Sequence, residues 1–341
     1  MGTYRLFLAL CVAASHCGAL VFGYDEGDIA VISFLLLSGF VMTLLIRKHY
    51  ETPATIVRFY TDRAARLLPQ FFFYTSLALG LLALTPLGGF HLPWMRFQQC
   101  GPGILATNFT LFANNFYWIF GNCQLIPASW SLGLEGFFYL SIPLILQAPA
   151  NKVRMSLAAL SFACFLCACF GKLEFDVWAY RLLPGNLFIF LAGSALARPS
   201  LYHRHLPKAV FVAAVLLLAL SFGVESMRQT PRVREMLAGL IIGIPAVALL
   251  SRKQFGRLDE MLGNISYGVF LNHLMVLWVF IAVFDLNRRT PHAPLYFLGL
   301  LAVSIALSWL TFTLVERPLI AFRRSLRSPG TRPHTVQAEA G

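Results

Sequence analysis

Arg5 and His16 are two ionisable residues within one apolar segment near the start of the chain, RLFLALCVAASHCGAL. Eleven residues of α-helix rise about 16 Å and turn through about 1100°, so both side chains share one helix face. With Arg5 at the membrane boundary, His16 lies near the middle of the bilayer. Ionisable groups at that depth face a bundle interior or a water-filled cavity. His16 therefore has the position and the chemistry of a general base. A histidine that only hydrogen-bonds a neighbouring helix is the alternative.

Glu135 is the only carboxylate in the apolar segment PASWSLGLEGFFYLSIPLIL, residues 127–146. A carboxylate within a membrane helix needs a cation or a hydrogen-bond donor. His16 is the candidate partner, because a carboxylate fixes the tautomer of a catalytic histidine and stabilises its charged form. The alternative is a glutamate near a helix end that backbone amides satisfy.

Arg63 and Arg66 lie three residues apart in RFYTDRAARLLP, residues 58–69, and so project from one face of a predicted helix. Paired guanidinium groups match the geometry of phosphate. The segment therefore predicts a phosphate-binding site where the chain enters the membrane. Simple topology-setting charges beside Asp62 are the alternative.

Three further segments carry residues of interest. Ser38 and Gly39, in SFLLLSGFVM, allow close approach of two membrane helices. His273, in GNISYGVFLNHLMVL, is a second histidine inside an apolar span. Residues 316–318, Glu-Arg-Pro, end the last span with adjacent charges and a helix-stopping proline.

The composition sets the class of protein that positions these residues. The chain has 341 residues, of which 58% are hydrophobic and only 12% charged, whereas a soluble domain carries about 25% charged residues. Apolar runs of about 20 residues recur, each long enough to cross about 30 Å of hydrocarbon. We predict an all-α integral membrane protein with about ten transmembrane helices. The predicted spans are 5–23, 28–46, 68–87, 129–147, 154–171, 180–197, 207–224, 234–251, 262–283 and 295–315.

The net charge of +12 is explained by membrane topology. Lys and Arg gather in cytoplasmic loops, and most of the 27 basic residues fall in cytoplasmic segments if both termini lie in the cytoplasm. We therefore predict that both termini lie in the cytoplasm. We also predict that the protein has no nucleic-acid partner. A cleaved signal peptide over residues 1–23 is the alternative, although the apolar run continues to Phe22.

The chain is predicted to form one transmembrane domain over residues 1–322 and a disordered basic cytoplasmic tail over 323–341. One long external loop, 88–128, is rich in aromatic residues and nearly uncharged. Cys100 and Cys123 both lie in this loop, where an oxidising compartment permits a disulfide; bonded and free forms both remain open. The seven cysteines show no metal-site spacing, so no metal site is predicted.

Taken in order, these segments resemble the acyltransferase-3 family of membrane O-acyltransferases. The family pattern is Arg-x10-His, an aromatic-rich stretch ending Ser-Gly-Phe, Arg-x-x-Arg before Leu-Leu-Pro, Trp-Ser-Leu-x-x-Glu, Ile-Ser-Tyr with a later His, and Glu-Arg-Pro. The matching segments here are 5–16, 34–40, 63–69, 130–139, 265–273 and 316–318. The chain departs from the pattern at residues 30–33, where the family often has Gly-Val-Asp-Ile, and at Gly136, where it often has a second carboxylate.

The resemblance implies transfer of an acyl group, most often acetyl, from cytoplasmic acyl-coenzyme A to a carbohydrate hydroxyl. It implies acyl-coenzyme A as co-substrate without a further cofactor, a carbohydrate or glycolipid acceptor such as exopolysaccharide or lipopolysaccharide, and a place among the lipids of the bacterial inner membrane. The residues expected to be catalytic are His16 and Glu135. The residues expected to bind substrate are Arg5, Ser38, Arg63, Arg66, Trp130 and His273.

In the mechanism that follows, His16 removes the proton of the sugar hydroxyl, which attacks the thioester, while Glu135 orients His16. A covalent acyl-His16 intermediate is the alternative chemistry. A proton-coupled transporter of a small molecule or glycolipid is the alternative function, with His16, Glu135 and His273 as a proton relay. An inactive membrane scaffold is the third possibility, and it would tolerate loss of His16.

Overall fold

The computed structural model describes residues 1–18, 20–89, 95–148, 150–201, 205–284 and 293–327. Helices make up the regular structure of these residues, and no strand longer than an isolated bridge occurs among them. The α-helices are α1 (Gly2–His16), α2 (Glu26–His49), α3 (Ile56–Leu84), α4 (Pro102–Thr107), α5 (Trp130–Gln147), α6 (Asn151–Cys169), α7 (Leu183–Ala197), α8 (Leu206–Gly223), α9 (Glu225–Gln229), α10 (Val233–Leu250), α11 (Arg257–Phe284), α12 (Ala293–Thr311) and α13 (Arg317–Arg327). Two π-helical segments, Asp176–Arg181 and Phe312–Glu316, precede α7 and α13.

Within the described residues, nine helical segments are long and apolar enough to cross a membrane. They correspond to the second through tenth predicted spans, so the predicted all-α membrane fold is confirmed. The predicted first span, residues 5–23, is wrong in its bounds. It corresponds to α1, which has 15 residues and a length of about 22 Å. The helix ends at His16 because Gly18, with φ +86°, turns the chain in the left-handed conformation that favours glycine.

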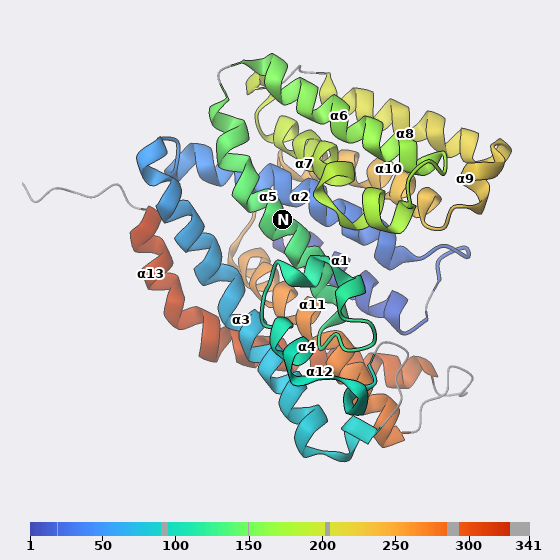
Figure 1. The fold of residues 1–341 in the computed structure, drawn as a ribbon. Helices are drawn as coiled ribbons and strands as arrows, with labels where there is room; N and C mark the ends of the chain where they lie inside the picture. Colours follow the sequence, from blue (N-terminus) through green and yellow to red (C-terminus); the bar gives the residue numbers. More distant parts are fainter. Residues whose placement is uncertain (19, 90–94, 149, 202–204, 285–292, 328–341) are drawn as a thin grey trace, which may run out of the picture.

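Successive long helices run in opposite directions, so their ends gather at two faces of the bundle. We call the face with the start of α1 and with α13 the inner end, following the predicted orientation, and the opposite face the outer end. Figure 1 shows α2 in the middle of the bundle, and α1, α5, α7 and α10 pack against it. α2 therefore forms the axis around which the other helices are arranged.

Two glycines permit a very close contact between α2 and α7. A Cβ atom on Gly39 of α2 would lie 1.9 Å from the carbonyl oxygen of Phe190 in α7. A Cβ atom on Gly193 of α7 would lie 1.9 Å from the carbonyl oxygen of Leu36 in α2. Because only glycine fits both places, α2 and α7 approach backbone to backbone. The contact holds Ser38, the residue before Gly39, at a fixed depth in the bundle.

α1 is held against α11 at its first turn. The side chain of Asp259 in α11 accepts hydrogen bonds from the backbone amides of Gly2 at 2.7 Å and Thr3 at 2.9 Å. These amides have no partner within their own helix, and an aspartate side chain is a favoured cap for them. The cap sets the two helices side by side in the same direction. This arrangement brings the far end of α1, at His16, level with the middle of α11.

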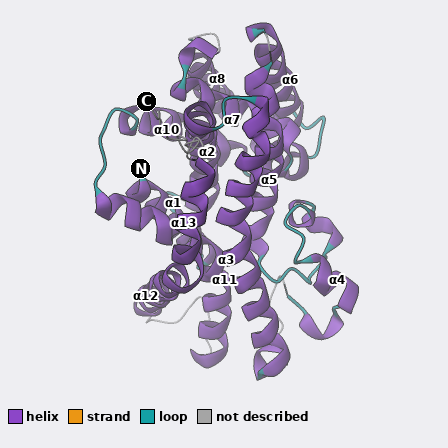
Figure 2. Ribbon diagram, turned by 90° about the vertical axis from the view of Figure 1, so that its left-hand side faces the viewer, coloured by secondary structure: helices purple, strands orange, loops and turns teal. Residues whose placement is uncertain are grey.

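The described residues between α3 and α5 form α4 and short helical turns, and Figure 2 shows α4 standing to one side of the long helices. Cys100 and Cys123 are joined by a disulfide with a Cα–Cα distance of 5.6 Å. Met95 and Cys123 also pair in an isolated antiparallel bridge. The disulfide and the β-bridge together hold Met95 and Cys100 beside Cys123 at the outer end.

The predicted disordered tail begins too early. α13 continues to Arg327, so residues 323–327 are helical, and residues 328–341 lie outside the described part of the chain. The reason is packing: α13 lies along α3, and Arg323 forms ion pairs with residues of the bundle. Charge density alone therefore gave the wrong boundary for this segment.

Candidate active site

A cavity of about 300 Å³ opens between α1, α2, α3, α5, α11 and α13. It is lined by apolar side chains of α2 and α11 and by a small number of polar groups. Five of the residues predicted from the sequence line it, from four different helices. These residues are Arg5, Ser38, Arg63, Arg66 and Glu135.

The inner end of the cavity holds a network of arginines and carboxylates. Asp62 pairs with Arg63 and, at 3.2 Å, with Nε of Arg323. Glu316 pairs with Arg66 and, at 3.4 Å, with Nη1 of Arg323. Both carboxylates are almost completely buried, with side-chain exposures of 0% and 2%. Three guanidinium groups, those of Arg63, Arg66 and Arg323, thus meet two buried carboxylates at this end of the cavity.

Arg5 brings a further guanidinium group to the cavity from α1. It lines the same cavity and lies within electrostatic range of Arg63 and Glu135. Charges in a cavity surrounded by protein are screened less than charges at a surface. The inner half of the cavity is therefore suited to an anionic ligand.

Glu135 lies deeper in the cavity and links α5 to α2. Its Oε1 atom accepts hydrogen bonds from Ser38 Oγ and from Tyr139 Oη, both at 2.5 Å. The predicted contact of Glu135 with His16 is therefore wrong, because α2 rather than α1 supplies its neighbour. Spacing along one helix could not show which helix lies beside it. Glu135 belongs to the cavity wall, together with two hydroxyl groups.

His16 pairs with His273 instead. Nδ1 of His16 lies 3.0 Å from Nε2 of His273, and the two rings stack with their centroids 5.1 Å apart. His273 is 1% exposed. His16 is exposed, at the end of α1 and beside the outer loop that follows it. The second predicted histidine is thus the partner of the first.

The hydrogen bonds assign the protons of this pair. Nδ1 of His273 lies 3.2 Å from the carbonyl oxygen of Val269, which only accepts, so this nitrogen carries a hydrogen. Nε2 of a neutral His273 is then an acceptor, and Nδ1 of His16 donates to it. Nε2 of His16 is left with its lone pair. His16 is therefore held in the tautomer that a general base at Nε2 requires.

Two phenylalanines of the cavity wall pack against each other, and one of them also lies beside His273. Phe34 and Phe270 both line the cavity, and their ring centroids are 6.0 Å apart. The Phe270 ring is also 6.1 Å from the ring of His273. Neither histidine lines the cavity itself. Phe270 is therefore shared between the cavity wall and the histidine pair.

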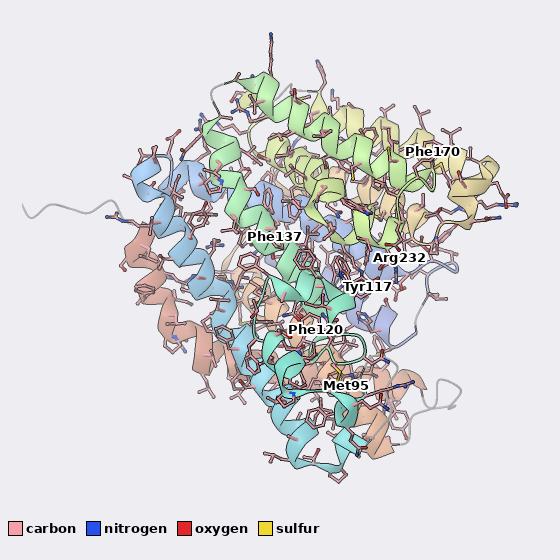
Figure 3. All side chains as sticks on the ribbon, viewed as in Figure 1. Met95, Tyr117, Phe120, Phe137, Phe170 and Arg232 are labelled. Atoms are coloured by element: carbon pink, nitrogen blue, oxygen red, sulfur yellow. A yellow bond between two sulfur atoms is a disulfide. The ribbon has the colours of Figure 1, made fainter. Side chains whose placement is uncertain are left out.

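Trp130 lies outside the cavity, at the outer end of α5. Its ring centroid is 4.8 Å from that of Tyr180, and the guanidinium carbon of Arg181 lies 4.6 Å from the Trp130 ring and 4.1 Å from the Tyr117 ring. Tyr117 is labelled in Figure 3. The structure therefore separates Trp130 from the other predicted binding residues and places it in an aromatic–arginine cluster.

Arg232, also labelled in Figure 3, extends this outer cluster. It pairs with Asp28 at 3.0 Å and with Asp176, and Tyr180 donates a hydrogen bond to Asp28. Burial disfavours the charge of Arg232, but the two carboxylates outweigh it and raise the pKa of Arg232. The cluster joins α2, the π-helical turn before α7 and the start of α10 at the outer end.

Arg323 and Tyr267 are polar residues of the cavity that sequence reasoning did not select. Arg323 was assigned to the tail, although alternating apolar and basic residues in RPLIAFRRSLR indicate an amphipathic helix. Tyr267 lines the cavity beside Arg66, whose guanidinium carbon is 5.5 Å from its ring. It lies in the segment with the Ile-Ser-Tyr pattern, which was the available signal.

Comparison with known proteins identifies the kind of domain. Residues 4–313 match a model of an acyltransferase domain, that of the acyltransferase-3 family. An uncharacterized protein of Aquifex aeolicus (strain VF5) is 28% identical over 208 residues, which cover 59% of this chain and 90% of that protein. Nodulation protein 10 of Rhizobium leguminosarum bv. viciae is 24% identical over 365 aligned positions, covering 94% of this chain and 93% of that protein. No solved structure matches the chain.

Proposed function

The chain belongs to the acyltransferase-3 family and is a multi-pass membrane acyltransferase, and from this premise we propose that it transfers an acetyl group from acetyl-coenzyme A to a hydroxyl of a carbohydrate or glycolipid. The proposal includes a location in the bacterial inner membrane and an acceptor such as exopolysaccharide or lipopolysaccharide. The observation that carries it is the arrangement of one basic cavity near the inner end of the bundle and one histidine pair, with Phe270 beside both.

The donor enters from the inner end in this proposal. Coenzyme A carries a pyrophosphate and a further phosphate, and guanidinium groups bind phosphate through paired, charge-assisted hydrogen bonds. Arg5, Arg63 and Arg66 line the inner half of the cavity. The thioester end then extends along the apolar wall toward Phe34 and Phe270. The predicted cytoplasmic side of this end agrees with the cytoplasmic supply of acyl-coenzyme A.

The acceptor approaches His16 from the outer end, where this residue keeps an exposed face. Nε2 of His16 takes the proton of the acceptor hydroxyl, and the hydroxyl oxygen forms a bond with the thioester carbonyl carbon. The carbon–sulfur bond then breaks, and the proton passes from His16 to the departing thiolate of coenzyme A. The products are an ester and free coenzyme A. General-base catalysis of this kind contributes about 10²–10⁴-fold to a rate.

His273 replaces Glu135 as the residue that orients His16. It accepts the Nδ1 hydrogen of His16 and so keeps Nε2 available as the base. Glu135 takes a different role in the proposal: with Ser38 and Tyr139 it forms a hydrogen-bonded group on the cavity wall that contacts the donor. The same tautomer leaves Nε2 of His16 able to act as a nucleophile, so a covalent acyl-His16 intermediate is the alternative chemistry.

The experiment that tests the proposal uses the purified protein in lipid nanodiscs with acetyl-coenzyme A labelled in its acetyl group. Cell-surface polysaccharide and glycolipid, freed of O-acetyl esters by mild base, serve as acceptors. The proposal predicts base-labile label in the carbohydrate and release of one thiol for each acetyl group transferred. Transmembrane movement of a glycolipid or small molecule without any transfer would contradict it and support a transporter.

Phe270 provides a test of the acetyl assignment. Replacement by alanine opens the end of the cavity beside the histidines, so a longer acyl chain is accommodated there. We expect the ratio of kcat/KM for butyryl-coenzyme A to that for acetyl-coenzyme A to rise about tenfold or more, since each methylene group is worth about 10-fold or more in a fitted pocket. Phe280→Ala, on the same helix but outside the cavity, is the control. An unchanged ratio would show that Phe270 does not limit the acyl chain.

A further inference from the structure

A second cavity, which we call the outer cavity, lies at the outer end of the bundle. Its volume is about 470 Å³, and its wall comes from the segment after α6, from α9 and from the residues before α10. Because successive long helices alternate in direction, α6 and α8 end and α10 begins on the face where α1 ends with His16. The outer cavity therefore lies on the side from which the acceptor approaches in the proposed function.

The outer cavity offers uncharged hydrogen-bonding groups from α9. Ser226 and Gln229 line it, three residues apart on one face of this helix. Nε2 of Gln229 donates to Glu225, which leaves the side-chain carbonyl oxygen of Gln229 as a free acceptor. The hydroxyl of Ser226 has no hydrogen-bond partner among the described residues, and it can both donate and accept. Both groups are thus available to a polar ligand.

The carboxylates of the outer cavity disfavour an anionic ligand. Glu174 and Asp176 line it, together with one guanidinium group, that of Arg232. Asp176 already pairs with Arg181 and Arg232. A phosphate or carboxylate in the cavity would lie beside both acidic side chains and be repelled by them. The wall suits a neutral ligand whose groups both donate and accept hydrogen bonds, and the hydroxyls of a carbohydrate are such groups.

Arg232 connects the outer cavity to the end of α1. Its backbone has φ +66°, which is uncommon for a residue with a side chain, and such residues gather at functional sites. Its Nε donates to Asp28, in the first turn of α2, at 3.0 Å. The residue before it, Gly27, packs on α1: a Cβ atom there would lie 2.6 Å from Oγ of Ser15, which precedes His16. One guanidinium group thus joins the cavity wall to the turn of α2 that touches the end of α1.

We propose that the outer cavity binds a neutral sugar unit of the carbohydrate acceptor, while a hydroxyl of a neighbouring unit reacts at His16. His16 does not line the outer cavity, so the unit bound there is not the one that receives the acetyl group. This inference rests on the proposed function and gives its acceptor a binding site. It also makes the acceptor a chain of sugar units and not a single sugar.

Ser226→Trp tests the site, because an indole ring fills the outer cavity. The acceptors are oligosaccharides made by partial hydrolysis of the de-O-acetylated cell-surface polysaccharide, and the protein is held in lipid nanodiscs. We expect the KM for an oligosaccharide of several units to rise about tenfold or more, since the hydrogen bonds to one sugar unit are lost. The kcat at saturating oligosaccharide and the Kd of coenzyme A should stay within about twofold of the wild type.

Two further variants separate binding from folding. Arg228→Trp places the same bulk on α9 but outside the cavity, at a side chain that is 58% exposed, and should leave all these constants unchanged. Gln229→Ala removes a hydrogen-bonding group without filling the cavity, so it should raise the KM for the oligosaccharide about fivefold. Each variant is first shown to be monodisperse by size-exclusion chromatography in detergent.

The outcomes are distinct. An unchanged KM for the oligosaccharide in Ser226→Trp would overturn the inference and leave the proposed function intact. An equal rise of this KM in Arg228→Trp would also overturn it, since it would assign α9 only a structural role. A wild-type protein that binds coenzyme A but transfers no acetyl group to any carbohydrate would overturn both the inference and the proposed function.

Discussion

Replacement of His16 by alanine is expected to lower the rate of acetyl transfer by about 10³-fold, within the range of about 10²–10⁴-fold for loss of a general base. His16 does not line the donor cavity. The Kd of coenzyme A should therefore change by less than about twofold. The measurement is the transfer of labelled acetyl to carbohydrate, together with coenzyme A binding to the same preparation.

His49→Ala is the matched control, because His49 ends α2 at the inner face of the bundle, far from the outer loop beside His16. It should transfer acetyl at the wild-type rate. Undiminished transfer by His16→Ala would remove His16 from the chemistry. Loss of transfer together with coenzyme A binding would show instead that the substitution disturbs the fold.

Replacement of His273 by leucine is expected to lower kcat by roughly 100-fold. His273 accepts the Nδ1 hydrogen of His16, and without an acceptor there the imidazole also populates the tautomer whose Nε2 is protonated. A glutamine at this position offers a carbonyl oxygen as an acceptor. We therefore expect His273→Gln to recover at least about tenfold of the activity that His273→Leu loses. The measurement is kcat for both variants at saturating acetyl-coenzyme A.

A double-mutant cycle shows whether His273 acts through His16. If it does, His16→Ala combined with His273→Leu should be no slower than His16→Ala alone, because a positioning residue has no effect without the residue that it positions. Additive losses would mean that His273 contributes independently, as a packing residue or as a second base. Equal activity of the leucine and glutamine variants would likewise argue against the tautomer assignment.

The membrane fold could be read from the sequence because hydrocarbon thickness sets the length of a spanning helix. The apolar runs therefore predicted the second through tenth spans. The predicted bounds of the first span were wrong for a local reason. The run continues to Phe22, but Gly18 ends the helix soon after His16, and hydrophobicity carries no information about that turn.

The sequence predicted which residues line the site better than it predicted which residues they contact. Arg5 and Arg63 share a cavity, as expected for two groups at one end of the bundle. Glu135 meets Ser38 rather than His16, because helix packing set by Gly39 and Gly193 decides which faces meet. Periodicity gives the face of a helix on which a residue lies, but not the helix that it faces.

The place of Arg323 in the fold could not be predicted from the sequence for a different reason. Its segment is short, basic and close to the end of the sequence, and such composition is typical of a disordered tail. Arg323 is held in place by two ion pairs. One is with Asp62, which lies far away in the sequence, and the other is with Glu316, which lies at the junction before α13. Contacts between distant segments are what a single sequence does not contain.

In the proposed mechanism, the acetyl group passes from a donor at the inner end to an acceptor at the outer end. The direct measurement uses sealed vesicles in which the protein has one known orientation, with labelled acetyl-coenzyme A confined to the side of Arg63 and Arg66. De-O-acetylated carbohydrate is placed on the opposite side. We predict that the carbohydrate gains label in the wild type and that His16→Ala labels it about 10³-fold more slowly. Label only in carbohydrate on the donor side would contradict this path through the membrane.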